Sequence, residues 1–230
     1  MAAPHYISKT LTAASDNAIS LSQTPAGAGN MLINGASATA GVATLDTQRQ
    51  VILTFAADET GHTFVVYGTS EGTDLLQETI AGTTAGVVAT TQNFKTVTRI
   101  SISAAATGAI KAGTNGIGAT RWHAVNWHVT PINIALAVNV TGTINYTVQY
   151  TVEDPGGTYP NPASVTQGYQ TTPAGPLIAF PTAFNHQTLA AQTATLDGSL
   201  QTPIAALRLL VNSGTGTAQL VYQQAELAGG

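Results

Sequence analysis

The stretch from Thr120 to Pro131, TRWHAVNWHVTP, gathers residue types that often bind metals or stack on ligands. It holds both tryptophans of the chain, two of its five histidines and one of its seven basic residues. Imidazole nitrogens are common zinc ligands, but His123 and His128 are five residues apart. In a strand they lie on opposite faces and do not chelate one metal together. We therefore expect a structural strand that contributes to an interface, with no metal site.

Two further patterns resemble functional sites. The segment GTSEG at residues 68–72 matches the G-x-S-x-G nucleophile elbow, which needs a strand before it and a helix after it. Here it lies between two probable strands, so we expect a turn. Five of the eleven acidic residues cluster without the spacing of a calcium loop, and we expect them to form a solvated rim on hairpin turns: Asp58, Glu59, Glu71, Asp74 and Glu78. We expect no enzyme activity and no cofactor.

The composition restricts the class of partner. Charged residues make up 8% of the 230-residue chain, against about 25% in typical globular proteins. The net charge of -4 has the wrong sign for binding a nucleic-acid backbone. No apolar run approaches the roughly 20 residues of a membrane span, and we see no secretory signal. We therefore expect synthesis in a cytoplasm and protein partners, with neither nucleic acid nor a membrane among the partners. The chain has no cysteine, which excludes disulfides and thiolate ligands.

Alternation of apolar and polar residues predicts an all-β fold. The clearest case is INIALAVNVTGTINYTVQYTVED, residues 132–154, where apolar residues occupy every second position on both sides of TGT. The segment predicts two strands joined as a hairpin. Similar patterns predict a hairpin of QVILTFAAD with HTFVVYGTS, and another of IAALRLLVN with GTAQLVYQQ. TDLLQETIAG is the one helix candidate, and its β-rich context favours a strand. The whole is typical of an antiparallel β-sandwich or jelly-roll-like protein.

Glycine- and proline-rich stretches divide the chain. We expect an N-terminal arm at residues 1–20, an N-terminal β module at 21–112 and a C-terminal β-sandwich module at 113–230. Six of the ten prolines fall between Pro155 and Pro181, which predicts an extended loop over 154–181. Loops of this length are often functional.

Several segments together resemble a β-rich protein family common in tailed bacteriophages. The resemblance runs from about residue 20 to the C-terminus and rests on QTPAGAGNMLINGASATAGVATLDTQRQVILTFAADETGHTFVVYGT, ETIAGTTAGVVATTQNFKTVTRISIS, TGTINYTVQYTVEDP and IAALRLLVNSGTGTAQLVYQQA. It implies a virion structural protein, most specifically a capsid decoration (cement) protein on the surface of the head. The implied partners are the major capsid protein or other virion proteins, and a homo-oligomer, with a trimer favoured.

Two alternatives stay open beside the decoration role. One is a neck, collar or tail component of the virion, and the other is a β-sandwich that binds glycans or a host surface. In each case we expect exposed aromatic and basic side chains to form the interface, and the candidates are Arg121, Trp122, Trp127, Tyr159, Tyr169 and Phe180.

Overall fold

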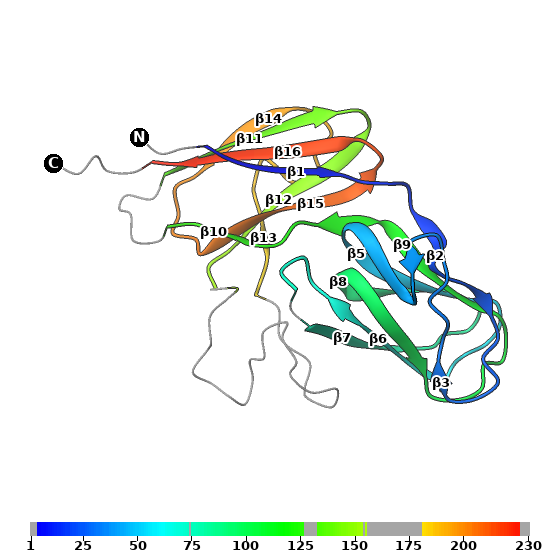
Figure 1. The fold of residues 1–230 in the computed structure, drawn as a ribbon. Helices are drawn as coiled ribbons and strands as arrows, with labels where there is room; N and C mark the ends of the chain where they lie inside the picture. The colour runs from blue at the N-terminus through cyan, green and yellow to red at the C-terminus, as the bar shows by residue number, and fades with distance from the viewer. Residues whose placement is uncertain (1–3, 74, 127–132, 154, 156–180, 226–230) are drawn as a thin grey trace. The chain divides into compact units, whose positions relative to one another are not determined.

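The structure is a computed structural model that describes residues 4–73, 75–126, 133–153, 155 and 181–225. Every regular element among these residues is a β-strand, sixteen in all (Figure 1). The predicted all-β class is confirmed. TDLLQETIAG contains a strand, Leu75–Ala81, as its β-rich context favoured. The predicted loop 154–181 lies, apart from Pro155 and Pro181, outside the described residues.

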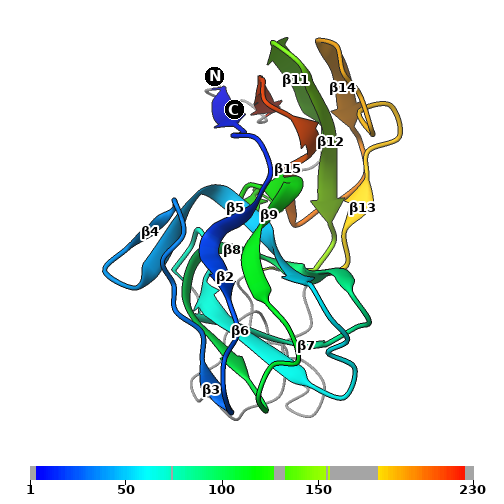
Figure 2. The same ribbon diagram turned by 90° about the vertical axis from the view of Figure 1, so that its right-hand side faces the viewer.

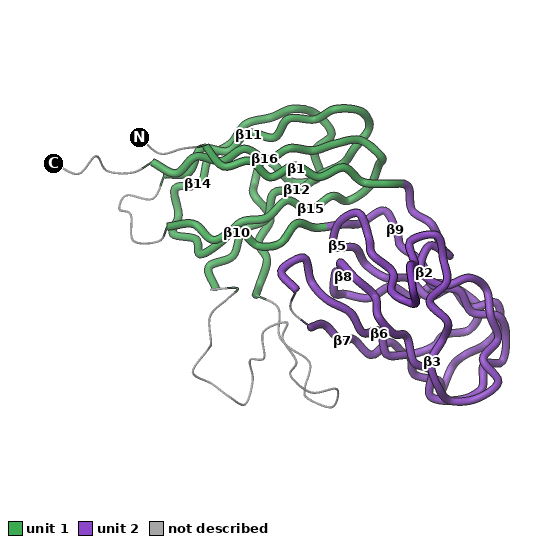
Figure 3. Tube along the Cα trace, in the orientation of Figure 1, with its two compact units in different colours: residues 1–12, 119–167, 179–230 green, residues 13–118, 168–178 purple. Residues whose placement is uncertain are grey.

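The strands group into two compact units (Figure 3). The described residues of unit 1 come from 1–12, 119–167 and 179–230, and those of unit 2 come from 13–118. Unit 1 therefore takes strands from both ends of the chain, whereas the sequence division had placed residues 1–20 in a separate arm. His5–Thr10 form a strand that pairs with Thr217–Tyr222 near the C-terminus, so this part of the expected arm belongs to a sheet.

Unit 1 contains eight strands in two sheets. One sheet has the order β1-β16-β11-β14, and in the other β10 and β12 flank β15 while β13 pairs with β12. All the strand pairs within these sheets are antiparallel. The bounds are β1 His5–Thr10, β10 His123–Ala124, β11 Ile134–Thr141, β12 Ile144–Thr151, β13 Phe184–Asn185, β14 Leu196–Leu200, β15 Ala206–Gly214 and β16 Thr217–Gln224.

The pairing in unit 1 is nested along the chain. Counting the eight strands in order, the first pairs with the eighth (β1 with β16) and the second with the seventh (β10 with β15). The third pairs with the sixth (β11 with β14) and the fourth with the fifth (β12 with β13). Two further pairs, β11 with β16 and β12 with β15, join these ladders into the two sheets.

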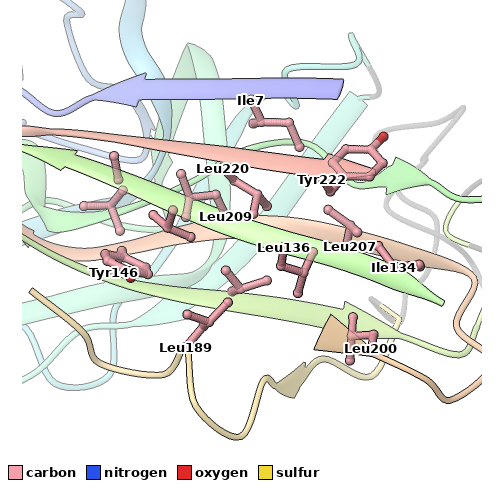
Figure 4. Close-up of a cluster of buried hydrophobic side chains, with 14 of the residues drawn as sticks. Ile7, Ile134, Leu136, Tyr146, Leu189, Leu200, Leu207, Leu209, Leu220 and Tyr222 are labelled. Atoms are coloured by element: carbon pink, nitrogen blue, oxygen red, sulfur yellow. The ribbon is translucent and has the colours of Figure 1, made fainter. Parts of the chain in front are cut away.

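The core of unit 1 gathers apolar side chains from both sheets (Figure 4). Leu136 of β11 and Leu220 of β16 belong to the same cluster as Tyr146 of β12 and Leu209 of β15. These residues occupy alternate positions of their strands, as period-2 patterning requires. Tyr146 is fully buried, and its hydroxyl donates to the carbonyl of Ala194 at 2.9 Å. Two antiparallel sheets with one core are consistent with a β-sandwich.

Unit 2 has its own run of hydrogen-bonded strands and its own core. Its strand order is β9-β5-β8-β6-β7, with β2 on β9, β3 on β8 and β4 on β5. Its core cluster includes Leu53, Phe64, Phe94 and Ile100, all fully buried. The bounds are β2 Ser15–Gln23, β3 Gly29–Asn30, β4 Ala38–Thr39, β5 Val42–Phe55, β6 Thr63–Thr69, β7 Leu75–Ala81, β8 Gly86–Ile102 and β9 Ile110–Ala119.

A tight turn joins β4 to β5 at one end of unit 2 (Figure 2). Thr39 pairs with Val42, which leaves Ala40 and Gly41 as a two-residue loop. Both have positive φ, 51° and 80°, as a type I′ turn requires. The twist of this turn matches that of the flanking strands, so the hairpin register is fixed locally.

The three predicted hairpins are wrong in their pairing, although their strands exist. β11 and β12 lie in different sheets, and so do β15 and β16. In unit 2, β8 lies between β5 and β6. A hairpin does form by pairing of β6 with β7, from Thr63↔Ala81 to Thr69↔Leu75, and it contains the GTSEG segment.

The physical reason is that alternation specifies the buried face of a strand but not its neighbour. Two consecutive amphipathic strands can pair edge to edge, or they can face each other across a core. The link at Gly142 and Thr143 lets β11 and β12 face each other across the core, with Gly142 at φ 77°. The backbone N–H groups of Thr215 and Gly216 both donate to the carbonyl of Thr143, at 3.0 and 2.9 Å. The β15–β16 link thus fixes the β11–β12 link.

Candidate functional site

Two of the six predicted interface residues lie in the described part of the chain. Arg121 and Trp122 come just before β10, and Arg121 is exposed while Trp122 is partly buried. Trp127, Tyr159, Tyr169 and Phe180 lie outside the described residues.

β10 positions Trp122 beside β15. His123 pairs with Leu207 and Ala124 with Ala206, so the same antiparallel register places Trp122 opposite Arg208. The carbon of the Arg208 guanidinium lies 4.4 Å from the centroid of the Trp122 ring, which is a cation–π contact. Leu207 and Leu209 point into the core of unit 1, so Arg208 between them lies on the outward face of the sheet.

Hydrogen bonds extend this Trp122–Arg208 pair across two more strands, β12 and β13. The Nε of Arg208 donates to Oε1 of Gln149 on β12 at 2.8 Å. The Nε2 of Gln149 in turn donates to Oδ1 of Asn185 on β13 at 2.9 Å. Each pair stands directly opposite in the ladder, Arg208 with Gln149 and Gln149 with Asn185. We call these four residues, Trp122, Arg208, Gln149 and Asn185, the transverse row.

Arg208 is the one charged member of the transverse row. Desolvation by burial lowers its pKa to about 10, so it still carries its proton at neutral pH. Its hydrogen bond in the described part of the chain comes from Nε, which leaves the two Nη groups without an acceptor there. An arginine in a protein usually satisfies these groups with a carboxylate or carbonyl oxygen. The transverse row therefore presents unused hydrogen-bond donors beside an aromatic ring.

Sequence reasoning found Trp122 but missed the other three members of the row. Arg208 stands between two leucines in ALRLLV, and Gln149 stands between apolar residues in TVQYT. Alternation could have placed each on an outward face. It could not have shown that they lie side by side, because that depends on which strands pair.

Arg121 interacts electrostatically with Tyr222 on β16. Burial raises the pKa of the Tyr222 phenol, and the nearby positive charge of Arg121 opposes this shift. Tyr222 also stacks on His5, with ring centroids 4.9 Å apart. Arg121 is therefore linked electrostatically to Tyr222 of β16.

The histidines that the structure describes do not assemble into a metal site. Among the described residues no group of three or more His, Cys, Asp or Glu is arranged to hold a metal ion. His186 is buried, and its Nδ1 accepts from the backbone N–H of Leu189 at 3.2 Å. Its Nε2 lies 3.1 Å from the carbonyl of Ser199, so it carries the proton in this tautomer. His128 lies outside the described residues.

The acidic cluster is not a uniform solvated rim, because two of its four described members are buried; Asp74 lies outside the described residues. Glu59 is fully buried; its Oε1 accepts from the backbone N–H groups of Thr107 and Gly108 at 2.8 and 2.9 Å. Its Oε2 lies 2.7 Å from Nδ1 of His62. Glu59 thus connects two loops of unit 2 by supplying acceptors for otherwise unpaired donors.

Glu78 plays a similar part at an irregularity in β8. The register between β5 and β8 shifts after the Gln50↔Asn93 pair, and β8 carries the extra residues. Oε1 of Glu78 accepts from the backbone N–H of Thr91 at 2.7 Å, and Oε2 accepts from that of Gln92 at 2.8 Å. Glu78 is 8% exposed, so both bonds are shielded from water. The sequence predicted a surface carboxylate here because it could not show the bulge.

The GTSEG segment forms a turn between two strands, as expected. The backbone N–H of Thr73 donates to the carbonyl of Ser70 at 3.1 Å, and that of Gly72 donates to Oγ of Ser70 at 3.0 Å. The serine hydroxyl therefore stabilises the turn. The next element that the structure describes is the strand β7 and not a helix, so the geometry of a nucleophile elbow is not formed.

Within the described ranges the chain has no helix of the length and apolarity that crossing a membrane requires. A search of protein-family models, curated proteins and solved structures finds none that matches the chain.

Proposed function

We propose that this chain is a structural protein of a tailed-phage virion, most specifically a decoration protein on the head. The observation that carries the proposal is the nested pairing of unit 1, in which the first strand pairs with the eighth and each inner pair follows in turn. This is the pairing expected of a jelly roll, an eight-stranded fold with two sheets. Jelly rolls are widespread in viral capsid proteins, which supports an assembly role.

The hydrogen bonds made by the buried ionisable groups also support an assembly role. The carboxylates of Glu59 and Glu78 and the imidazole of His186 are occupied by hydrogen bonds that hold loops and a bulge in place. Their chemistry stabilises the fold. Net charge is small, so contacts with partners would come from surface complementarity more than from long-range electrostatics.

The outward face of the β1-β16-β11-β14 sheet is the surface we propose for contact with the major capsid protein. Tyr6 pairs with Val221, and Val221 with Ala137, across three strands. Their neighbours Ile7 and Leu220 belong to the core, so this row faces outward. Tyr6 is 64% exposed and stands among small or neutral side chains, a composition that suits a protein interface.

Copy number per particle tests the location. Quantitative mass spectrometry of purified particles should give this chain in a ratio comparable to the major capsid protein. A few copies per particle would place it in the neck or tail instead. Its absence from particles would overturn the virion proposal.

Rebinding to particles that lack the protein tests the surface. Tyr6→Ser should lower occupancy strongly, because it removes the largest exposed apolar group of the face. Leu32→Ser is the matched control, since Leu32 is 66% exposed but belongs to unit 2. Equal occupancy of the two variants would refute the assigned face. Light scattering of the free protein would report whether it forms the proposed trimer.

A further inference from the structure

The geometry points to a second binding site on unit 1, separate from the assembly surface. We propose that the transverse row binds an acidic saccharide, with a sugar carboxylate on Arg208 and the sugar ring against Trp122. The proposal goes beyond the virion role and does not depend on it.

The first step concerns the unused donors of Arg208. Its Nε is held by Gln149 at 2.8 Å, and this bond fixes the plane and direction of the guanidinium. The two Nη groups have no acceptor among the described residues, and the side chain is partly removed from water. A planar fork of this kind binds a carboxylate through two parallel hydrogen bonds. An anion at this point would also neutralise the one charge of the row.

The second step concerns Trp122. The flat apolar face of an indole stacks on the C–H face of a pyranose ring, while its N–H remains able to donate a hydrogen bond. Trp122 is partly exposed and is held in place by the guanidinium 4.4 Å from its ring centroid. Because the tryptophan is fixed before any ligand arrives, binding loses less conformational entropy.

The third step concerns the other end of the row. Asn185 is exposed, and its Oδ1 is held by Gln149. Its amide nitrogen is free to turn to a ligand because the bond engages the oxygen. From Trp122 to Asn185 the row spans three interstrand spacings, about 14 Å. An aromatic ring, a cation and an amide at this spacing match the apolar face, the carboxylate and the hydroxyl groups of a short acidic oligosaccharide.

These features favour a saccharide over an acidic peptide. A peptide carboxylate would satisfy Arg208 but would leave the aromatic ring and the terminal amide without a defined role. A neutral saccharide would satisfy the ring and the amide but would leave the guanidinium uncompensated. An acidic saccharide uses all three.

The test is isothermal titration of the full chain with trigalacturonic acid, a short polyuronate. Its methyl ester is the matched control ligand, because it keeps the rings and hydroxyls and loses the charges. We expect the chain to bind the acid and to bind the ester at least tenfold more weakly. High salt should lower the affinity for the acid. No binding of the acid, or equal affinity for acid and ester, would overturn the proposal.

Variants test the place of binding. Arg208→Gln should lower the affinity for trigalacturonic acid by about tenfold or more. The affinity of Arg208→Lys should lie between those of the unmodified chain and Arg208→Gln, since lysine keeps the charge but loses the planar fork of donors. Arg99→Gln is the matched control, because Arg99 also stacks on an aromatic ring, Tyr67, at 3.7 Å, but lies in unit 2. Similar affinity of Arg208→Gln and Arg99→Gln would show that the saccharide binds elsewhere.

Two measurements keep the result decisive. If Arg208→Gln does not fold, ligand-induced shifts of the Trp122 indole and Asn185 amide resonances in the unmodified chain report the site directly, and no shift at either would refute it. A glutamate tripeptide that binds as tightly as the saccharide would overturn the saccharide assignment in favour of a protein partner. Particle occupancy of the Arg208 variants is measured separately, so this proposal and the virion role can fail independently.

Discussion

Replacing Glu78 by glutamine tests whether a buried carboxylate holds the bulge of β8. Glu78→Gln keeps the size of the side chain but turns one acceptor oxygen into an amide donor. In the native protein, Oε1 serves the backbone N–H and the hydroxyl of Thr91, and Oε2 serves the backbone N–H of Gln92. The glutamine can keep the Thr91 bonds in a weaker, uncharged form, but its NH₂ then faces the N–H of Gln92, donor against donor.

The size of the effect follows from these three bonds. A hydrogen bond to a charged group contributes about 1.5–3 kcal/mol, and a neutral one contributes about 1 kcal/mol. Losing one charged bond and weakening two should lower the free energy of unfolding of unit 2 by about 3 kcal/mol. At a urea dependence of about 2 kcal/mol per molar, the midpoint should fall by about 1.5 M.

Urea unfolding followed by circular dichroism, together with amide hydrogen exchange at Thr91 and Gln92, measures this effect. Asp197→Asn is the control, because it makes the same chemical change at an exposed position on β14 of unit 1. It should alter stability by less than about 0.5 kcal/mol. If Glu78→Gln is as mild as the control, the carboxylate does not hold the bulge and the reasoning fails.

Two further predictions concern a glycine and a surface carboxyl. Gly214→Ala should destabilise unit 1 by about 2 kcal/mol or more in thermal unfolding, because Gly214 has φ 105° and a Cβ there would lie 2.3 Å from the carbonyl oxygen of Thr143. Gly27→Ala, with open space around it, should cost little, and equal effects of the two would contradict the packing argument. Two hydrogen bonds from the Thr60 side chain and backbone lower the pKa of Asp58, so this group contributes stability above its unfolded pKa and loses it as pH falls through the folded value. Thr60→Val should raise the pKa of Asp58 in a carboxyl NMR titration, and an unchanged pKa would refute the cause.

The sequence predicted the strands and their buried faces well, because both are local properties. Ile134, Leu136 and Val138 alternate in the chain and belong to one core. The partners of these strands were not predictable in the same way. β11 pairs with β16, more than seventy residues later, and nothing in either segment identifies the other. A short glycine link suggests a hairpin, and here such links cross from one sheet to the other.

The candidate site shows the same limit. The sequence identified Trp122 as a candidate because it is a tryptophan. Its partners come from β15, β12 and β13, and they lie together only because of the registers in which these strands pair. The burial of Glu59 and Glu78 was likewise hidden, because the donors that they satisfy are backbone groups of a distant loop for Glu59 and of the bulge in β8 for Glu78. Side-chain chemistry can be read from the sequence, whereas the backbone groups that need an acceptor depend on the fold.

The nested pairing of unit 1 has a consequence for synthesis on the ribosome. Its outermost ladder joins His5–Thr10 to Thr217–Tyr222, so β1 has no partner until every strand between the two has been made. The last strand of unit 2, β9, ends at Ala119, so the strands of unit 2 are complete much earlier. Domains generally fold as units while the chain emerges, and pairings between distant segments form slowly. We therefore expect unit 2 to fold first and unit 1 to close only when β16 leaves the ribosome, which makes the emergence of β16 the step that commits unit 1 to its native state.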